Sequence, residues 1–228
     1  MKTRHVLSLV SSLAVLSLPC LSRAADVGDP VFPDDLKGKA RAELIYQNFQ
    51  RELDVDVENF DGEADLEADV FMLRLHSDVG QFATLDFDIG GLDAGEDYTL
   101  YAGVGLRYLA YDSQDWRIST FLQGHYAPDA SDEGVEFDLI DADFGALISR
   151  KIVIDDQLTL MPYAGPALSI IRVDGDFNDV DLSFDAEEDS IIGLIAGLSI
   201  QMRGMNGIRL EAQLYDEVSI SAAASIAF

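Results

Sequence analysis

Two pairs of aspartates are the residues of this sequence best suited to chemistry. Asp86 and Asp88, and likewise Asp141 and Asp143, lie two residues apart, and on a β-strand that spacing points both members of a pair to one face. Four carboxylates gathered with a nearby histidine such as His125 would be able to activate water as general bases. The same carboxylates can instead neutralise arginines in a polar interior, because a buried charge has to be paired or hydrated. We favour the second interpretation.

The aspartate pairs lie on segments that have the period of a β-strand. Leu85, Phe87 and Ile89, for example, alternate with Asp86 and Asp88, which is the pattern of a strand with one apolar and one polar face. Short stretches rich in Gly, Asp and Asn separate the segments, as expected of turns. We predict ten strands, at residues 39–50, 67–77, 81–91, 97–111, 116–127, 136–150, 157–173, 190–203, 208–215 and 219–228.

The connections between these strands predict a topology. Connections after even-numbered strands are compact, whereas three of those after odd-numbered strands are long and acidic, at residues 51–65, 128–135 and 174–189. Short turns at one end and long outer loops at the other are typical of outer-membrane barrels. We therefore predict an all-β fold, a closed antiparallel transmembrane β-barrel of about ten strands, with eight as the alternative count. Pro162 and Pro166 predict a bulge or bend in the seventh strand.

Two observations favour a barrel with its charged face inside. The apolar set is too large for the lumen of a ten-strand barrel, and Tyr98, Tyr108 and Trp116 lie near strand ends, where interfacial aromatic residues belong. A soluble periplasmic lipocalin-like binding barrel, with the faces reversed, is the alternative. We assign no catalytic residue and no metal ligand. The predicted lumen charge network comprises Arg41, Glu43, Arg74, Asp86, Asp88, Arg107, Arg117, Asp141, Asp143, Arg209 and Glu211.

The last ten residues form the strand that would close the barrel. Apolar residues occupy alternate positions from Ile220 to Phe228, and small residues such as Ser219 and Ser221 lie between them. A terminal strand that is unpaired on one side would be an aggregation template, so we expect it to pair back to residues 39–50. The segment resembles the C-terminal signature of bacterial outer-membrane barrels, which ends in Phe. The resemblance implies that Ile226 and Phe228 act as an assembly signal.

The histidines do not indicate a metal site. The predicted topology places His76 near the periplasmic end and His125 near the extracellular end, most of a barrel height apart. A hydrolase that acts on lipid A through His125 with Ser119 or Ser131 would need a lipid-facing groove, for which no motif is visible. Omptin-type outer-membrane proteases are also ten-stranded and use acid pairs and a histidine. This sequence resembles them in strand number alone, because their Asp-x-His motif is absent.

The acidic stretch at residues 174–189 is the candidate cation loop. Asp174, Asp176, Asn178 and Asp181 carry oxygen ligands at spacings that suit Ca²⁺ or Mg²⁺. Asp179 stands where an EF-hand loop needs glycine, and no helices flank the stretch. We favour a solvated acidic loop that faces lipopolysaccharide through bridging divalent ions, and we expect no other cofactor.

The N-terminal residues predict export. A basic start, an apolar run and small residues before position 25 are typical of a secretory signal peptide, residues 1–24, followed by a periplasmic arm, residues 25–38. Cleavage there would remove Cys20, the single cysteine. The formal net charge is −27 although 48% of the residues are hydrophobic. Such an acidic chain repels nucleic acids, so we exclude them as partners.

We therefore predict an integral outer-membrane barrel, residues 39–228, in the envelope of a Gram-negative-type bacterium. Its predicted role is structural, surface interaction or narrow, porin-like solute passage. The alternative is a barrel enzyme, a protease or a lipid A-modifying hydrolase. Carboxylates clustered at the rim beside His125 would favour the enzyme, and carboxylates buried at mid-lumen would favour a plug. The expected partners are outer-membrane lipid and lipopolysaccharide, with periplasmic chaperones and the barrel assembly machinery during biogenesis. The sequence leaves the oligomeric state open.

Overall fold

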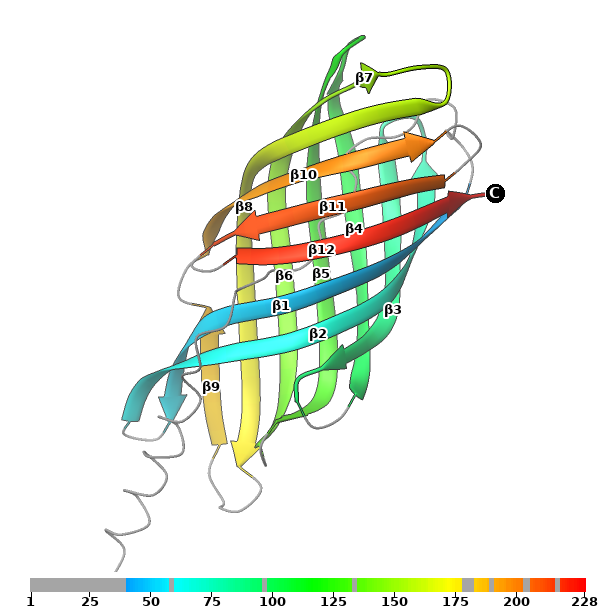
Figure 1. Ribbon diagram of the computed structural model, residues 1–228. Helices are drawn as coiled ribbons and strands as arrows, with labels where there is room; N and C mark the ends of the chain where they lie inside the picture. Colours follow the sequence, from blue (N-terminus) through cyan, green and yellow to red (C-terminus); the bar gives the residue numbers. More distant parts are fainter. Residues whose placement is uncertain are drawn as a thin grey trace, which may run out of the picture.

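The computed structural model describes residues 40–57, 60–95, 98–132, 135–177, 183–188, 191–202, 206–215 and 218–228. Every regular element in these ranges is a β-strand (Figure 1). The predicted signal peptide and arm, residues 1–24 and 25–38, lie outside the described residues and stay predictions. The strands are β1 Arg41–Val57, β2 Phe60–Val79, β3 Ala83–Asp93, β4 Tyr98–Asp112, β5 Trp116–Asp132, β6 Val135–Arg150, β7 Ile152–Val153, β8 Leu158–Phe177, β9 Ser183–Glu188, β10 Ile192–Met202, β11 Asn206–Leu214 and β12 Val218–Ala227.

Ten of these strands form a closed antiparallel barrel, which confirms the predicted fold class. The order is β1, β2, β3, β4, β5, β6, β8, β10, β11 and β12, and β12 pairs back to β1 with Arg41 opposite Ala227. The last strand therefore closes on the first where expected. Both chain ends of the barrel lie at one end, which we call periplasmic, and the opposite end is called extracellular. The described residues contain no helix long and apolar enough to cross a membrane.

The outer surface of the barrel is a belt of apolar side chains. Leu44, Val104 and Leu122 lie on three different strands, point outward, and are 63%, 61% and 55% exposed. Exposing this much apolar surface to water is unfavourable by about 25 cal/mol per Å², whereas lipid removes that penalty. The structure thus places apolar side chains outside and charged side chains inside, which is the arrangement of a transmembrane barrel. This arrangement excludes the lipocalin-like alternative, in which the faces are reversed.

Toward the extracellular end the polarity of the two faces is exchanged. On β1, Leu44 points outward and Glu43 is buried, whereas ten residues later Asp54 is exposed and Val55 is buried. The strands β2, β6 and β8 change polarity in the same way. An outer face that switches from apolar to acidic side chains indicates that lipid has given way to water, so the exchange marks the outer boundary of the membrane.

The three segments predicted as long loops are largely strand. β1 and β2 pair continuously from Arg41 opposite His76 to Val57 opposite Phe60, so the predicted loop 51–65 is the end of a hairpin. In the same way, β5 and β6 extend into residues 128–135. In the predicted loop 174–189, β8 continues to Phe177 and residues 183–188 form β9. The prediction of loops was wrong because acidic residues are typical of turns, whereas here they form the water-facing side of strands.

These strands build a six-stranded extension above the membrane boundary. Its order is β5, β6, β8, β9, β1 and β2, so β9 joins β8 directly to β1, which lie apart where β10, β11 and β12 intervene (Figure 1). The inner face is apolar and includes Leu53, Val70, Leu139, Val173 and Ala186. The interior of the barrel is therefore apolar on the extracellular side, and below this layer it holds the charged residues beside a smaller apolar cluster that includes Phe121 and Leu147. The sequence analysis missed this division.

The strand β8 bends without a bulge. Its pairing with β10 runs through Pro162 and Pro166 with no register shift, and the ribbon of β8 curves strongly along its length (Figure 1). Register shifts occur instead where β5 pairs with β4, at Leu109 and Tyr111, and within β5 where it pairs with β6. Of the two predicted alternatives, a bulge or a bend, the structure therefore has the bend.

Candidate functional site

All eleven residues of the predicted lumen charge network are buried inside the barrel. Arg41 is the most exposed of them and retains 8% of its accessible surface, whereas Arg74 retains none. Strand alternation puts them there, because each occupies a position between outward-facing residues. So many buried charges are compatible with a stable fold only where each one meets an opposite charge or a hydrogen bond.

Arg74 and Asp88 lie at the centre of the network. The guanidinium holds the carboxylate with two hydrogen bonds, Nε–Oδ1 at 2.8 Å and Nη2–Oδ2 at 2.7 Å, and neither side chain has any exposed surface. His125 extends the contact, since its Nε2 lies 2.8 Å from Asp88 Oδ2 and its Nδ1 lies 2.9 Å from Asp141 Oδ1. One histidine therefore joins a member of each predicted aspartate pair.

Gly103 makes the contact between His125 and Asp88 sterically feasible. The two residues belong to β5 and β3, and Gly103 of β4 lies between them in the ladder. A Cβ atom on Gly103 would lie 2.0 Å from Cδ2 of His125, so the imidazole occupies the space that any other residue would fill. Tyr101 stacks on the imidazole with ring centroids 4.8 Å apart and donates a hydrogen bond of 2.5 Å to Asp141.

A second chain of contacts follows the inner wall of the barrel toward the closing seam. Arg107 Nε lies 2.6 Å from Asp86 Oδ2, and His76 Nδ1 lies 2.7 Å from Asp86 Oδ1. On its other side, His76 Nε2 lies 3.4 Å from Glu43 Oε2, and the same oxygen lies 3.0 Å from Arg209 Nη2. Acids and bases alternate along this chain, so no carboxylate lies beside another without a base between them.

The second chain ends on β8. Arg209 Nη1 lies 3.5 Å from Glu211 Oε2, and the hydroxyl of Tyr163 donates a hydrogen bond of 2.7 Å to the same oxygen. Gln213 donates to the other oxygen of Glu211, also at 2.7 Å. The chain therefore follows the inner wall of the barrel from β4 through the seam to β8.

The small side chains of β12 allow the contacts across the seam. In the ladder, Arg209 of β11 lies opposite Ala223, and Glu43 of β1 lies opposite Ser225. Arg209 and Glu43 meet over β12 because neither of these small residues fills the space between them. The predicted small inner face of the last strand is thus present, and long side chains from its neighbours occupy the room it leaves.

Arg51 is the member of the network that the sequence analysis missed. It is fully buried on β1, its Nη1 lies 3.5 Å from Ser219 Oγ, and its guanidinium lies 4.4 Å from the centre of the Tyr215 ring. The residue was missed because residues 51–65 were predicted to be a loop. Continuing the inward alternation of Arg41 and Glu43 to position 51 would have found it.

The three remaining predicted members of the network have other partners. Arg117 binds Asp112, with Nε 2.6 Å from Oδ1, and the Asp112 side chain is 35% exposed, so this pair lies at the periplasmic mouth. Asp143 accepts a hydrogen bond of 3.0 Å from Gln123 Nε2. Arg41 begins β1, where it lies opposite His76.

The two histidines belong to one region of the lumen, which corrects the expectation that they lie far apart. His76 contacts Asp86 and His125 contacts Asp88, and these aspartates are two residues apart on β3. The expectation neglected the stagger of a tilted barrel, in which a row of paired residues climbs from strand to strand. Within the described ranges, no group of three or more His, Cys, Asp or Glu residues is arranged to hold a metal ion.

The geometry around His125 is unsuited to general base catalysis. Both imidazole nitrogens contact carboxylates, and the side chain has no exposed surface. A general base needs a nitrogen within reach of the proton that it abstracts from water or substrate. The contacts of His125 instead hold Asp88 and Asp141 in place, which is a structural role.

The predicted cation loop lies partly on the extension. Asp174 and Asp176 belong to β8, whereas Asn178 and Asp181 lie outside the described residues. Asp174 lies opposite Asp185 of β9. A hydrogen bond between these two carboxyl groups lowers the pKa of Asp174 and raises the pKa of Asp185. Cation binding by this segment stays a prediction.

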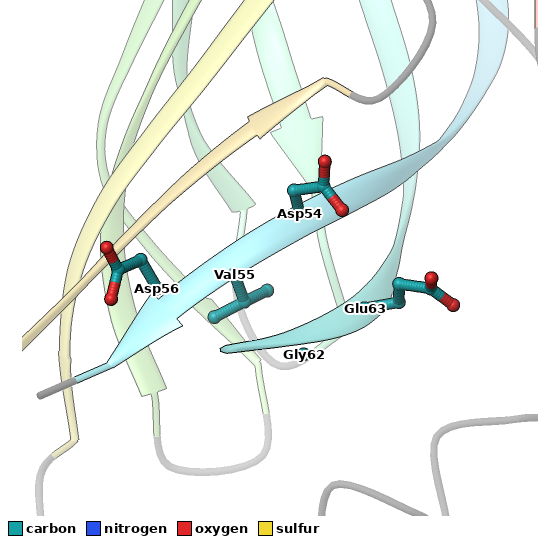
Figure 2. A pocket seen from close by; sticks show the side chains of 5 residues that line it. All are labelled: Asp54, Val55, Asp56, Gly62 and Glu63. Carbon is teal, nitrogen blue, oxygen red and sulfur yellow. The ribbon is translucent and has the colours of Figure 1, made fainter. Parts of the chain in front are cut away.

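A hollow of about 610 Å³ opens at the hairpin of β1 and β2 (Figure 2). Asp54, Val55 and Asp56 of β1 and Gly62 and Glu63 of β2 line it. Three of these five side chains carry carboxylates and none carries a positive charge, so the hollow would attract cations and repel anions.

The predicted assembly signal lies at the periplasmic end. Ile226 and Phe228 are 53% and 67% exposed on the outer surface, and the backbone N–H of Phe228 donates a hydrogen bond of 3.0 Å to the carbonyl of Ala40. Recognition of these residues during assembly stays a prediction.

No protein-family model and no curated protein matches the chain. Similar solved structures include the outer membrane protease OmpT from Escherichia coli, with 6% identity, 84% of this chain and 98% of that chain covered, and a TM-score of 0.48. The attachment invasion locus protein Ail of Yersinia pestis has 9% identity, coverages of 83% and 98%, and a TM-score of 0.34. The translocator domain of autotransporter NalP from Neisseria meningitidis has 10% identity, coverages of 98% and 95%, and a TM-score of 0.40. Similarity at this level carries no argument about activity.

Removing Arg74 should destabilise the barrel more than removing its whole ion pair. We expect Arg74→Met to lower the free energy of unfolding by about 3–5 kcal/mol, because Asp88 would remain buried without its guanidinium partner. Arg74→Met/Asp88→Leu should recover most of that loss. The control is Arg172→Met, which breaks a pair on the exposed surface and should cost less than about 1 kcal/mol. Urea unfolding from lipid vesicles measures all three, and a double variant at least as unstable as Arg74→Met would contradict the pairing.

A side chain at Gly103 should displace His125. Gly103→Ala should lower the free energy of unfolding by about 1–3 kcal/mol through overpacking, and adding the same substitution to a His125→Ala barrel should cost much less. Gly124→Ala is the matched control, because its Cβ would meet its nearest neighbour at 3.4 Å. Heat-dependent gel mobility of the folded barrels reports the order of stability. If Gly103→Ala and Gly124→Ala behave alike, the steric account of Gly103 is wrong.

Proposed function

We propose that this chain is an outer-membrane barrel whose lumen is closed by its own side chains, and that the acidic extension above the membrane carries its biological role. The burial of Arg74 and Asp88 at mid-lumen, with no exposed surface on either side chain, is the observation that supports a closed lumen. A ten-strand barrel is narrow, and the two chains of paired charges along its inner wall are buried. The role is therefore structural or one of surface interaction.

The position of the carboxylates favours this role over an enzyme. Asp88 and Asp141 are buried against Arg74 and His125, beneath an apolar layer that includes Leu139. A protease or a lipid A-modifying hydrolase needs its catalytic groups accessible at the extracellular rim. The carboxylates of Asp88 and Asp141 are occupied by these contacts and are buried, so a substrate at the rim would not reach them.

The outer surface suggests which partners the barrel has. At the membrane boundary, Tyr46 donates a hydrogen bond of 3.0 Å to Asp69, and Tyr126 donates one of 2.8 Å to Asp138. Carboxylates at this level suit contact with lipopolysaccharide phosphates through bridging Ca²⁺ or Mg²⁺. The acidic extension suits cationic partners and repels nucleic acids. During biogenesis, chaperones and the assembly machinery would recognise Phe228 by binding it.

Electrical conductance tests the closed lumen. The refolded barrel in a planar bilayer should show no steady conductance, because the buried charge network leaves no continuous water path. Replacing Arg74, Asp88 and His125 together by Ala removes the central side chains and should open a measurable pore. The matched control, Arg172→Ala/Asp174→Ala/Asp185→Ala, removes three interacting side chains from the exposed extension and should stay closed. A steady ion current through the unaltered barrel would instead establish narrow solute passage.

A further inference from the structure

The strand β9 alone closes the extension between β8 and β1. It pairs with residues 53–57 of β1 on one side and with residues 172–176 of β8 on the other. Its inner face is apolar, since Ala186 is 1% exposed and Phe184 packs against the same buried cluster. Burial of these two side chains favours the docked position of the strand.

The outer face of β9 opposes its docking. Asp185 lies directly opposite Asp56 of β1 and directly opposite Asp174 of β8. In the same row, Asp174 lies opposite Asp138 of β6, and Asp56 lies opposite Asp61 of β2. Five strands therefore carry an aspartate at the same level, and like charges directly opposite on paired strands are destabilising.

One base offsets part of this repulsion. Glu187, in the next row, lies between Arg172 of β8 and Asp54 of β1. Arg172 lies 3.2 Å from Asp174 and 3.7 Å from Asp185. The remaining acids of the adjoining segments are Asp176, opposite Ser183 of β9, and Glu188, opposite Leu53 of β1. The charge on and around β9 stays strongly negative.

We propose that β9 is a charge-controlled strap, docked between β8 and β1 when its carboxylates are neutralised by protons or screened by salt, and released when they are ionised at low ionic strength. Release would uncover the apolar inner faces of β1 and β8, including Val55 and Val173. This inference rests on the proposed function, because it describes how the interaction surface of the extension is regulated.

The direction of the pH dependence follows from the pair at the centre of the row. The hydrogen bond with Asp174 raises the pKa of Asp185. Protonated Asp185 stabilises the docked strand, and this stabilisation is lost as the pH rises through the raised pKa of Asp185. The pKa of Asp174 is lowered, so its favourable contacts are lost only when the pH falls further. Docking is therefore tightest in the pH window in which Asp185 is protonated and Asp174 is ionised.

Thiol labelling of a buried β9 position measures release. In a full-length Cys20→Ser background reconstituted in vesicles, Ala186→Cys is buried while β9 is docked. At fixed pH 7, a membrane-impermeant maleimide should label it about threefold faster at roughly 10 mM than at roughly 150 mM salt. Asp56→Asn/Asp174→Asn should slow labelling and abolish the salt dependence. Hydrogen exchange of the β9 amides in the barrel with native Ala186 should show the same trend.

Asp129→Asn/Glu136→Gln is the matched control, because it removes the same charge from strands that do not pair with β9. It should keep the salt dependence. Equal labelling at both salt concentrations, or an equal effect of the control, would overturn the strap. Conductance recorded on the same vesicle preparation separates the two proposals, since an open lumen would overturn the proposed function and leave the labelling result unaffected.

Discussion

Pairing of buried charges across neighbouring strands is the interaction on which the barrel depends. Arg74 and Asp88, or Arg209 and Glu43, meet only if every strand keeps its register with the next, because a slip of one residue would turn each side chain to the opposite face. The β1–β12 seam completes the ring and sets the register at which these contacts form. The network and the closure thus stabilise one another. Any other register would be unstable, because it would leave buried charges without partners.

The same strands contact lipid below the membrane boundary and water above it, and the alternation of polar and apolar residues in their sequences changes at that boundary. Below the boundary they present apolar side chains to lipid and enclose charge, as at Leu44 and Glu43. Above it they present acids to water and enclose an apolar layer, as at Asp54 and Val55. The extension is therefore built like a piece of soluble barrel on a membrane barrel. Its negative outer face is the surface that molecules on that side of the membrane would encounter.

Local sequence was sufficient for the features that depend on alternation alone. The closing strand, the orientation of the faces and the eleven buried charges all follow from a period of two. The alternation of inward-facing and outward-facing residues on β1 also extends through Arg51. The acidic residues beyond Arg51 predict a loop when they are considered by composition alone. The roles of Gly103 and β9 depend on which residues face each other across two strands. That depends on the stagger of the closed barrel, which no single segment of sequence encodes.

Spin-label accessibility along β12 tests the central claim most directly. Labels placed one at a time at residues 219–224 lie on the strand that closes the barrel. Labels at positions 220, 222 and 224 should be accessible to oxygen dissolved in lipid, whereas labels at 219, 221 and 223 should be protected from both oxygen and a water-soluble nickel chelate. Chelate access to 219, 221 and 223 would reveal a water-filled lumen and contradict the closed, charge-paired interior.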